Sequence, residues 1–304
     1  MVANASCQLA IETAGLTKRF GRTTAVDDLT LRIPKGSTFG FIGPNGAGKT
    51  TTIRMLMRNL RMTCGEARVL GIDVTADPAG MKQRVGYVPE LHYVYRWMRV
   101  HQVIGFCRSL YATWNDELCA ELLRLFELDA NKKVKHLSKG MVAKLALLLA
   151  VAHEPELLIL DEPTSGLDAI IREEFLDGVL RTICERQNTV LFSSHTLSDV
   201  QRLADRVGII YEGRLLVDCP TEDLLTGTKR IRAVLRDGCT PGEVPEGTIW
   251  QRFGHREWLL TVRGFSPATL EFVRGKYAVD SIEVIDLGLE DVFKDFVKGR
   301  RASA

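Results

Sequence analysis

The sequence predicts an α/β fold, in which strands alternate with helices around a central sheet. Short apolar runs that are typical of buried strands recur along most of the chain, and segments with helical apolar spacing lie between them. One strand-like run also passes directly into a Gly-rich turn and then into a helix expected over Lys49–Asn59. With 304 residues, the chain is long enough for one large domain and a small one.

The strands expected in the first part of the chain share a mainly apolar or alternating pattern. They are 7–13, 25–33, 37–43, 83–89, 157–161, 189–194 and 206–211. Run 37–43 leads into the Gly-rich turn. Pro89 ends run 83–89, because proline cannot donate a hydrogen bond to a strand ladder. Helices are expected between the later strands.

From about residue 91 to about residue 155 the pattern is mostly helical. Helix-like apolar spacing recurs in 100–112, 116–128 and 140–152. Strand-like runs precede and follow this stretch. We therefore expect a helical subdomain inserted into an α/β domain that spans residues 1–227.

The chain changes character after about Gly227. Residues 238–248 concentrate Gly and Pro, which is typical of turns between short strands. The elements expected around them are strands 229–236, 257–264 and 277–286 and helices 266–275 and 289–299. Residues 228–304 should form a small α+β accessory domain, and they carry no catalytic constellation.

Composition is that of a soluble globular protein, with 45% hydrophobic and 26% charged residues. A net charge of +2 gives no strong field toward nucleic acid or an anionic membrane. The seven cysteines form no CxxC pair, and their odd number argues against a disulfide framework. The N-terminus shows no secretion signal, and the longest apolar run, Leu145–Ala152, is far shorter than the ~20 residues of a membrane helix. We expect a cytoplasmic chain, to which another protein would supply any membrane-spanning part.

The segment GPNGAGKTT matches the phosphate-loop pattern GxxxxGK[ST] and lies between an expected strand and an expected helix. In that setting backbone N–H groups surround a phosphate chain, Lys49 reaches the β and γ phosphates, and the Thr50 hydroxyl binds Mg²⁺. The residues expected to bind ATP here are Gly43, Pro44, Asn45, Gly46, Ala47, Gly48, Lys49, Thr50 and Thr51. The flanking strand and helix distinguish this segment from a plain Gly-rich turn.

Two acidic residues follow the buried strand expected at 157–161. The apolar run LLIL delivers Asp161 and Glu162 to the carboxyl end of that strand, where ligands bind in open α/β sheets. Asp161 is placed to hold Mg²⁺, and Glu162 could polarise the water that attacks the γ-phosphate. An isolated Asp-Glu pair would be a solvated strand end, but after a phosphate loop the catalytic interpretation is favoured.

The segment LSKGM stands directly before the helical run 141–152. Serine is a good N-cap residue, and a helix N-terminus gathers unpaired N–H groups and a partial positive charge. Such an end is either an ordinary cap or a place to hold an anion. The residues alone leave both interpretations of Ser138 open.

Together these motifs resemble the ATP-binding subunits of ABC transporters, over roughly residues 8 to 225. In that family LSGGQ marks the signature helix, and LSKGM takes its place here; SGLD matches the D-loop, and His195 after LFSS matches the switch histidine. The resemblance implies a head-to-tail dimer of ATP-binding subunits, identical or different, in which each signature helix faces the phosphate loop of the other chain. Ser138 and Gly140 would then contact the γ-phosphate of ATP bound to the second chain.

The resemblance also implies ATP-site roles for four further residues. Phe20 would stack on adenine, Val26 would lie at the nucleotide, Asp168 would act across the interface, and His195 would contact the γ-phosphate. The plainer alternatives are a packed aromatic for Phe20, a turn or N-cap aspartate for Asp168, and a polar loop residue for His195.

Three residues depart from the family pattern. Lys139 and Met141 replace the usual Gly and Gln, and Lys139 either adds positive charge near the phosphates or lies in solvent. Glu90, after GYVP, stands where the family commonly has glutamine. A carboxylate there can bind Mg²⁺ as a hard oxygen ligand, although it brings negative charge close to the γ-phosphate. We expect Glu90 to keep a Mg²⁺-linked catalytic role with altered turnover.

The resemblance thus predicts a Mg²⁺-dependent ATPase subunit, peripheral on the inner face of the cell membrane, that powers transport through a separately encoded permease. The motifs LSKGM and GYVPE look most similar to those of bacterial subunits paired with export-type permeases. Residues 91–100 combine aromatics with two arginines, which is typical of an interface with such a partner; ordinary packing and nucleic-acid binding stay open. The alternative function is a soluble ABC-type ATPase that acts on nucleic acid or ribosomes.

Overall fold

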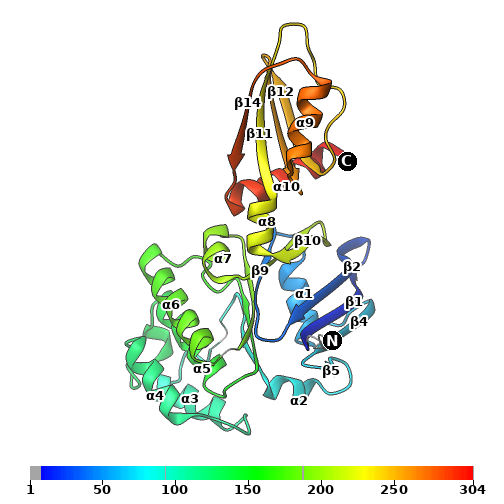
Figure 1. Ribbon diagram of the computed structural model, residues 1–304. Coiled ribbons are helices and arrows are strands. Elements are labelled where there is room, and N and C mark those ends of the chain that lie inside the picture. Colours follow the sequence, from blue (N-terminus) through cyan, green and yellow to red (C-terminus); the bar gives the residue numbers. More distant parts are fainter. Residues whose placement is uncertain (1–7, 93, 187, 304) are drawn as a thin grey trace, which may run out of the picture. The chain divides into compact units, whose positions relative to one another are not determined.

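The computed structural model describes residues 8–92, 94–186 and 188–303 (Figure 1). The chain divides into two compact units, of which the first ends at Asp218 and the second begins at Cys219. The change in composition after Gly227 led us to expect the division later in the chain. The difference arises because helix α8 (Thr221–Gly227) belongs to the second unit and runs directly into its first strand.

A six-stranded sheet forms the centre of the first unit, in the order β10–β9–β3–β8–β7–β6. Its strands are β3 (Thr38–Ile42), β6 (Val85–Val88), β7 (Leu157–Asp161), β8 (Thr189–Ser194), β9 (Arg206–Tyr211) and β10 (Arg214–Pro220). The pairs β6–β7, β7–β8, β8–β3 and β3–β9 are parallel. Every residue of β3, β7 and β8 is buried, as expected for parallel strands covered on both faces. The carboxyl ends of these strands therefore meet at one edge.

A second, antiparallel sheet has the order β2–β1–β4–β5. It consists of β1 (Leu9–Phe20), β2 (Thr23–Pro34), β4 (Cys64–Val69) and β5 (Ile72–Asp73). The long hairpin of β1 and β2 contributes buried residues to a hydrophobic core shared with the six-stranded sheet and the first helix, α1 (Lys49–Leu56). The sequence did not predict β4, because its first three residues are exposed and its apolar pattern is weak.

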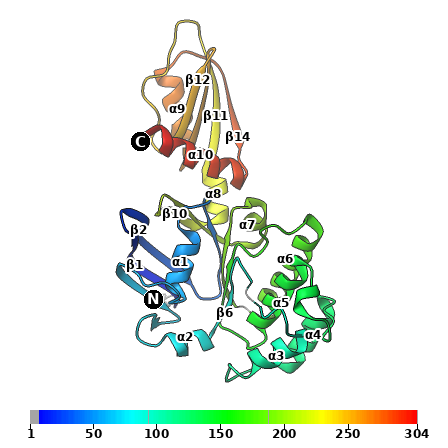
Figure 2. The ribbon, with the colours of Figure 1, turned by 180° about the vertical axis from the view of Figure 1, so that it is seen from behind.

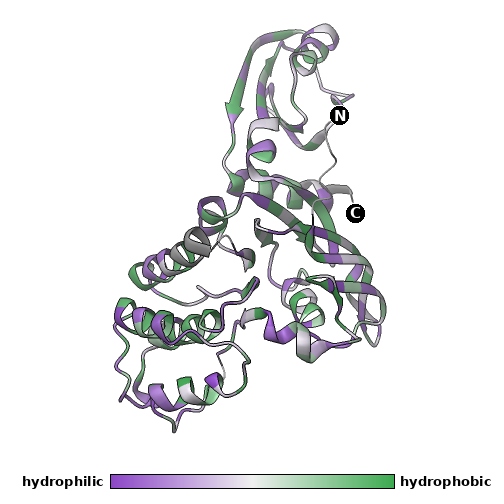
Figure 3. Ribbon diagram, turned by 60° about the horizontal axis from the view of Figure 1, so that its bottom comes forward, coloured by the Kyte–Doolittle hydropathy of each residue, from purple (hydrophilic) through white to green (hydrophobic). Residues whose placement is uncertain are grey.

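The other helices of the first unit lie mostly on the side away from the β1–β2 hairpin, as Figures 1 and 2 show from opposite directions. They are α3 (Val100–Arg108), α4 (Asp116–Leu125), the 3₁₀ turn Val134–His136, α5 (Lys139–Val151), α6 (Ala169–Arg186) and α7 (Leu197–Leu203), while the short α2 (Pro78–Gln83) precedes β6. Figure 3 shows that these helices carry both polar and apolar residues. Their buried side chains pack against one another and the sheet.

The second unit is an antiparallel sheet with the order β12–β13–β11–β14. Its strands are β11 (Thr228–Leu235), β12 (Thr248–Gly254), β13 (Glu257–Arg263) and β14 (Val279–Asp286), and its remaining helices are α9 (Pro267–Lys276) and α10 (Leu289–Ser303). Trp258 is fully buried in its core together with residues of β11 and Val273 of α9. The sequence missed β12, because most of its side chains are exposed.

The predicted α/β core with its mixed sheet, helical segment and small α+β appendage is thus confirmed. No helix in the described residues is long and apolar enough to cross a bilayer.

Candidate active site

The Gly-rich turn after β3 wraps around the start of α1 and is held by neighbouring backbone. Gly48 has φ 111°, and a Cβ on it would lie 2.6 Å from the Ala25 carbonyl oxygen of β2, so this position requires glycine. The Ala47 carbonyl accepts a hydrogen bond from the Gly213 N–H at 3.0 Å. The turn is thereby fixed between the β1–β2 hairpin and the segment after β9.

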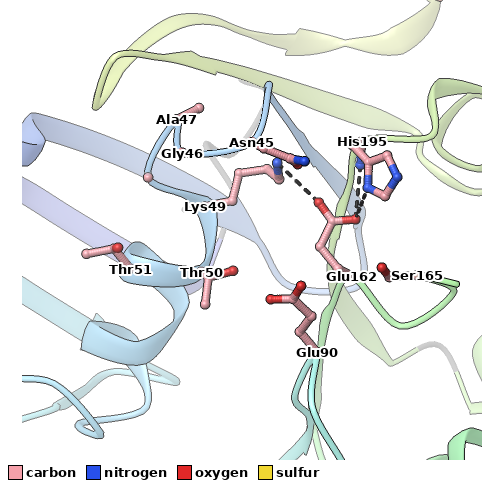
Figure 4. Close-up of a pocket in the computed structure, with 11 residues that line it drawn as sticks. Asn45, Gly46, Ala47, Lys49, Thr50, Thr51, Glu90, Glu162, Ser165 and His195 are labelled. Carbon is pink, nitrogen blue, oxygen red and sulfur yellow. Dashed lines mark hydrogen bonds and ion pairs between the residues drawn. The ribbon is translucent and has the colours of Figure 1, made fainter.

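A pocket of about 250 Å³ opens beside this turn (Figure 4). It is lined by Asn45, Gly46, Ala47, Gly48, Lys49, Thr50, Thr51, Glu90, Glu162, Ser165 and His195. The last four come from the segments that follow β6, β7 and β8. The pocket therefore lies at the carboxyl edge of the parallel strands, where the topology of an open α/β sheet places ligands.

Lys49 is buried, and its ammonium group has three oxygen neighbours. The Nζ atom donates to the Gly43 carbonyl at 2.7 Å and to the Pro44 carbonyl at 3.3 Å, and it lies 3.1 Å from Glu162 Oε1. The aliphatic stem of Lys49 is buried, while the charge is directed into the pocket (Figure 4). A phosphate in this pocket would find a cation that is already in place and partly neutralised by one carboxylate.

Glu162 is held between two cationic or potentially cationic groups. Its Oε2 accepts a hydrogen bond from the His195 backbone N–H at 3.2 Å and lies 2.6 Å from His195 Nδ1, while Oε1 faces Lys49. Glu162 also has φ 49°, a strained value for a non-glycine residue. This conformation turns its N–H onto the Ser193 carbonyl and hydroxyl oxygens and aims the carboxylate into the pocket. The arrangement can orient and polarise a water molecule.

Asp161 is the last residue of β7, directly before Glu162, and is 1% exposed. The hydroxyl groups of Thr50 and Ser193 both donate to its Oδ1, at 3.0 and 2.9 Å. Its Oδ2 is buried and has no hydrogen-bond partner in the described structure. Burial raises the pKa of Asp161, and the charges of Glu90 and Glu162 raise it further, whereas the two hydroxyl hydrogen bonds act in the opposite direction.

The unpartnered oxygen of Asp161 fits a divalent cation. The Thr50 hydroxyl is already bonded to the same carboxylate, and Glu90 lines the same pocket from an exposed position after β6. The described residues hold no group of three or more His, Cys, Asp or Glu side chains close enough to cage a metal ion. Mg²⁺ needs no such cage, because it is usually bound by one or two protein ligands together with water and substrate phosphates.

Comparison with known proteins identifies the family. The family described as "ABC transporter" matches residues 26–165. The bacitracin transport ATP-binding protein BcrA of Bacillus licheniformis is 36% identical over 70% of this chain and 71% of its own length. The chain belongs to the ABC transporter ATP-binding proteins. The daunorubicin/doxorubicin resistance ATP-binding protein DrrA of Streptomyces peucetius is 37% identical over 77% of this chain and 73% of its own. A solved structure of an ATP-binding subunit of an ABC transporter superimposes with a TM-score of 0.65 at 26% identity, covering 71% of this chain and 92% of that one.

The signature segment of this ABC ATPase lies at the start of α5, outside the pocket. Ser138 is exposed, and its hydroxyl oxygen accepts a hydrogen bond from the Met141 N–H at 3.2 Å, so it caps the helix. Gly140 is buried, and a Cβ on it would lie only 2.3 Å from Ile171 Cγ2 of α6. Only glycine allows the two helices to approach this closely.

The D-loop follows Glu162 and lies between the pocket and the signature helix. Ser165 lines the pocket, a role that the sequence did not predict although the residue belongs to the quoted SGLD motif. Asp168 is exposed and accepts a hydrogen bond from the Ile171 N–H at 3.0 Å, which makes it the cap of α6. The Lys139 ammonium lies against Gly166, where it would clash with a Cβ. Lys139 therefore extends toward the D-loop of its own chain.

Phe20 and Val26 belong to the β1–β2 hairpin and do not line the pocket. Val26 is fully buried and packs beside Gly48, so it supports the phosphate loop from behind. Phe20 ends β1 with half of its surface exposed, and the Lys18 ammonium lies 4.9 Å from the centre of its ring.

Proposed function

We propose that this chain is the Mg²⁺-dependent ATP-hydrolysing subunit of a transporter and drives a separately encoded membrane permease. The observation that carries the ATPase assignment is the placement of the Glu162 carboxylate between Lys49 and His195 beside the phosphate loop. Lys49 would bind the β and γ phosphates, Glu162 would accept a proton from the attacking water, and His195 would contact the γ-phosphate. Thr50 and Asp161, with Glu90, would hold Mg²⁺, which neutralises phosphate charge when bound.

The site would be completed by a second subunit in a head-to-tail dimer. Ser138, Gly140 and Asp168 do not line the pocket of their own chain, and Ser138 and Asp168 are exposed. The N-terminus of α5 presents unpaired N–H groups and a positive dipole end, which suit a phosphate. The signature segment would therefore act on nucleotide bound to the other subunit. Both a homodimer and a heterodimer satisfy this arrangement.

The permease would dock on an exposed aromatic cluster that follows β6. Tyr95 lies 5.9 Å from Trp97 and 5.8 Å from Phe106, measured between ring centres, and 67% of Trp97 is exposed. Leu91 and Leu110 add exposed apolar surface. Tyr93 of the same segment lies outside the described residues. Exposed aromatic and apolar side chains of this kind are typical of binding surfaces, and the exposed Leu91 directly follows Glu90 in the sequence.

Export is the favoured direction. Among the relatives, BcrA is named for bacitracin transport and DrrA for daunorubicin and doxorubicin resistance. A chain of this kind would work at the inner face of the cell membrane.

Purification from native cells in a gentle detergent tests the proposal. We expect a polytopic membrane protein to co-purify in stoichiometric amounts and to be identified by mass spectrometry. The matched comparison is the double variant Trp97→Ala/Tyr95→Ala, which should lose the membrane protein yet still bind ATP, because these side chains lie on the surface outside the pocket. Recovery of ribosomal proteins or nucleic acid without a membrane partner would contradict the transporter assignment and favour a soluble ATPase.

A further inference from the structure

A buried carboxylate near the candidate active site does not belong to the residues that line the pocket. Asp199 stands in the first turn of α7, four residues after His195, and is 3% exposed. Arg172 Nε donates to its two carboxylate oxygens at 2.8 and 3.0 Å. The Thr164 hydroxyl donates to Oδ2 at 3.1 Å. One carboxylate thus connects α7 to the D-loop and to the start of α6, which lie 35 and 27 residues earlier in the sequence.

Thr164 provides the connection to the D-loop. It is 7% exposed and lies between Glu162 and Ser165, both of which line the pocket. The Ser165 N–H donates to the Glu162 carbonyl at 3.0 Å, and the Leu167 N–H donates to the Thr164 carbonyl at 3.2 Å. These two turns give the loop its shape, and the Thr164 side chain is its anchor to α7.

Arg172 provides the connection to α6. Its backbone N–H donates to the Asp168 carbonyl at 2.9 Å, so it belongs to the turn that ends the D-loop. Its guanidinium also donates to Ser198 Oγ at 3.1 Å in addition to the paired contact with Asp199. Both ends of the segment 164–168 are therefore tied to the beginning of α7, which directly follows the His195 loop.

We infer that Asp199 is a positioning residue that fixes the D-loop against the His195 segment and so sets the relation of Glu162 to His195. The inference rests on the proposed ATPase function. Removing a partner from a buried carboxylate strongly destabilises the folded state. The network therefore favours a single arrangement of the D-loop and α7 over a range of arrangements. In the pocket, the same two segments meet where Glu162 Oε2 approaches His195 Nδ1 at 2.6 Å. Asp199, outside the pocket, thus fixes the relative positions of Glu162 and His195 inside it.

The network also connects the exposed Asp168 to His195. The Arg172 backbone N–H bonds to Asp168, and the Arg172 side chain bonds to Asp199. A displacement of Asp168 would therefore be transmitted through Arg172 to Asp199. Asp199 lies on the same short helix that begins after His195. A second subunit that displaces the D-loop of this chain would thereby also displace His195 of this chain.

The test uses Thr164, because its side chain can be changed without removing a charge. Thr164→Val keeps the shape but removes the hydroxyl donor to Asp199, and Thr164→Ser keeps the donor. The matched control is Thr189→Val: Thr189 is a buried threonine at the opposite end of β8 whose hydroxyl oxygen accepts a hydrogen bond from the Gly36 N–H at 2.9 Å. Steady-state phosphate release gives kcat and KM for ATP, and calorimetric titration with ADP gives nucleotide affinity.

We expect Thr164→Val to lower kcat by about tenfold while KM and ADP affinity change by less than roughly threefold, because positioning acts on the transition state rather than on binding. Thr164→Ser and Thr189→Val should keep kcat within about twofold of the parent chain. Hydrogen–deuterium exchange should rise in 162–168 and 194–199 in Thr164→Val alone.

Two other results would overturn the inference. One is a normal kcat in Thr164→Val; the other is a loss of kcat that Thr189→Val reproduces to the same extent, which would indicate general destabilisation. An unmodified chain that hydrolyses no ATP would instead contradict the proposed function, and the exchange measurement would then decide on the network alone.

Discussion

The ammonium of Lys49 and the carboxylate of Glu162 lie 3.1 Å apart, and both side chains are more than nine-tenths buried. The residue suited to bind phosphate is thus paired with the residue suited to activate water. A phosphate group that enters the pocket competes with Glu162 for Lys49, since phosphate and carboxylate are both anions that pair with the ammonium group. Nucleotide binding would therefore release the Glu162 carboxylate for its task next to His195.

The first prediction concerns Glu162→Gln. We expect turnover to fall by about 10²-fold or more, because the amide cannot accept the proton of the attacking water. ATP binding should be retained and even tightened, since the amide competes less well for Lys49, and an ATP-bound dimer should accumulate. Phosphate release and size-exclusion chromatography with ATP measure these effects. Glu156→Gln, which removes an exposed carboxylate paired with Arg84, is the control. Near-normal turnover in Glu162→Gln would show that another group is the principal base.

The second prediction concerns the shared site. If each pocket needs the signature segment of another subunit, the activity per subunit of purified protein should fall on dilution, because dissociation leaves every site incomplete. Constant specific activity well below the dimer dissociation constant would rule out the shared site. Mixing offers a second measurement. Lys49→Ala and Ser138→Trp chains should each be inactive alone, and their mixture should regain activity, since one pocket of the mixed dimer keeps an intact Lys49 opposite an intact Ser138.

Sequence patterns predicted the features that depend on neighbours in the chain. The buried run before Asp161 placed two carboxylates at a strand end, and the phosphate-loop motif placed Lys49 beside them. Elements with exposed side chains were missed, such as β4 and β12, because burial on one face leaves only a weak alternation.

Sequence patterns did not predict contacts between segments that are distant in the chain. Asp199 was not singled out, since its partners Thr164 and Arg172 come from other segments and no local spacing connects them. The helix expected over Lys49–Asn59 ends at Leu56, where Met57 and Arg58 leave helical geometry, and helix ends are set by such local caps.

The third prediction concerns the tight approach of Gly140 to α6. Gly140→Ala should destabilise the chain by about 1–3 kcal/mol, because the new methyl group would overlap Ile171 Cγ2. Thermal unfolding measures the effect. Gly105→Ala is the matched control: Gly105 lies in α3 with open space where a Cβ would stand, so this variant should be neutral or slightly stabilising, since alanine favours helix. Adding Ile171→Ala to Gly140→Ala should recover part of the loss. Equal Tm values for Gly140→Ala and the parent chain would contradict the close packing.

The fourth prediction concerns the pH dependence that Asp161 confers. Burial raises its pKa above the ordinary value of 3.8, so the folded state holds this proton more tightly than the unfolded state does. The ionised carboxylate therefore destabilises the fold, and this effect sets in as pH rises from 3.8 through the raised pKa. Asp161→Asn keeps an acceptor for Thr50 and Ser193 without the charge.

At neutral pH, Asp161→Asn should gain stability of about 1 kcal/mol, or roughly 2–4 °C in Tm, while Mg²⁺-dependent ATP hydrolysis is lost. The gain should shrink as pH falls through the raised pKa and should vanish below 3.8, where the carboxyl is protonated in both states. Thermal unfolding at a series of pH values, in Mg²⁺-free buffer, measures the difference between the two chains. A variant that is less stable than the parent at neutral pH would mean that the hydroxyl hydrogen bonds of Thr50 and Ser193 outweigh the burial of the charge.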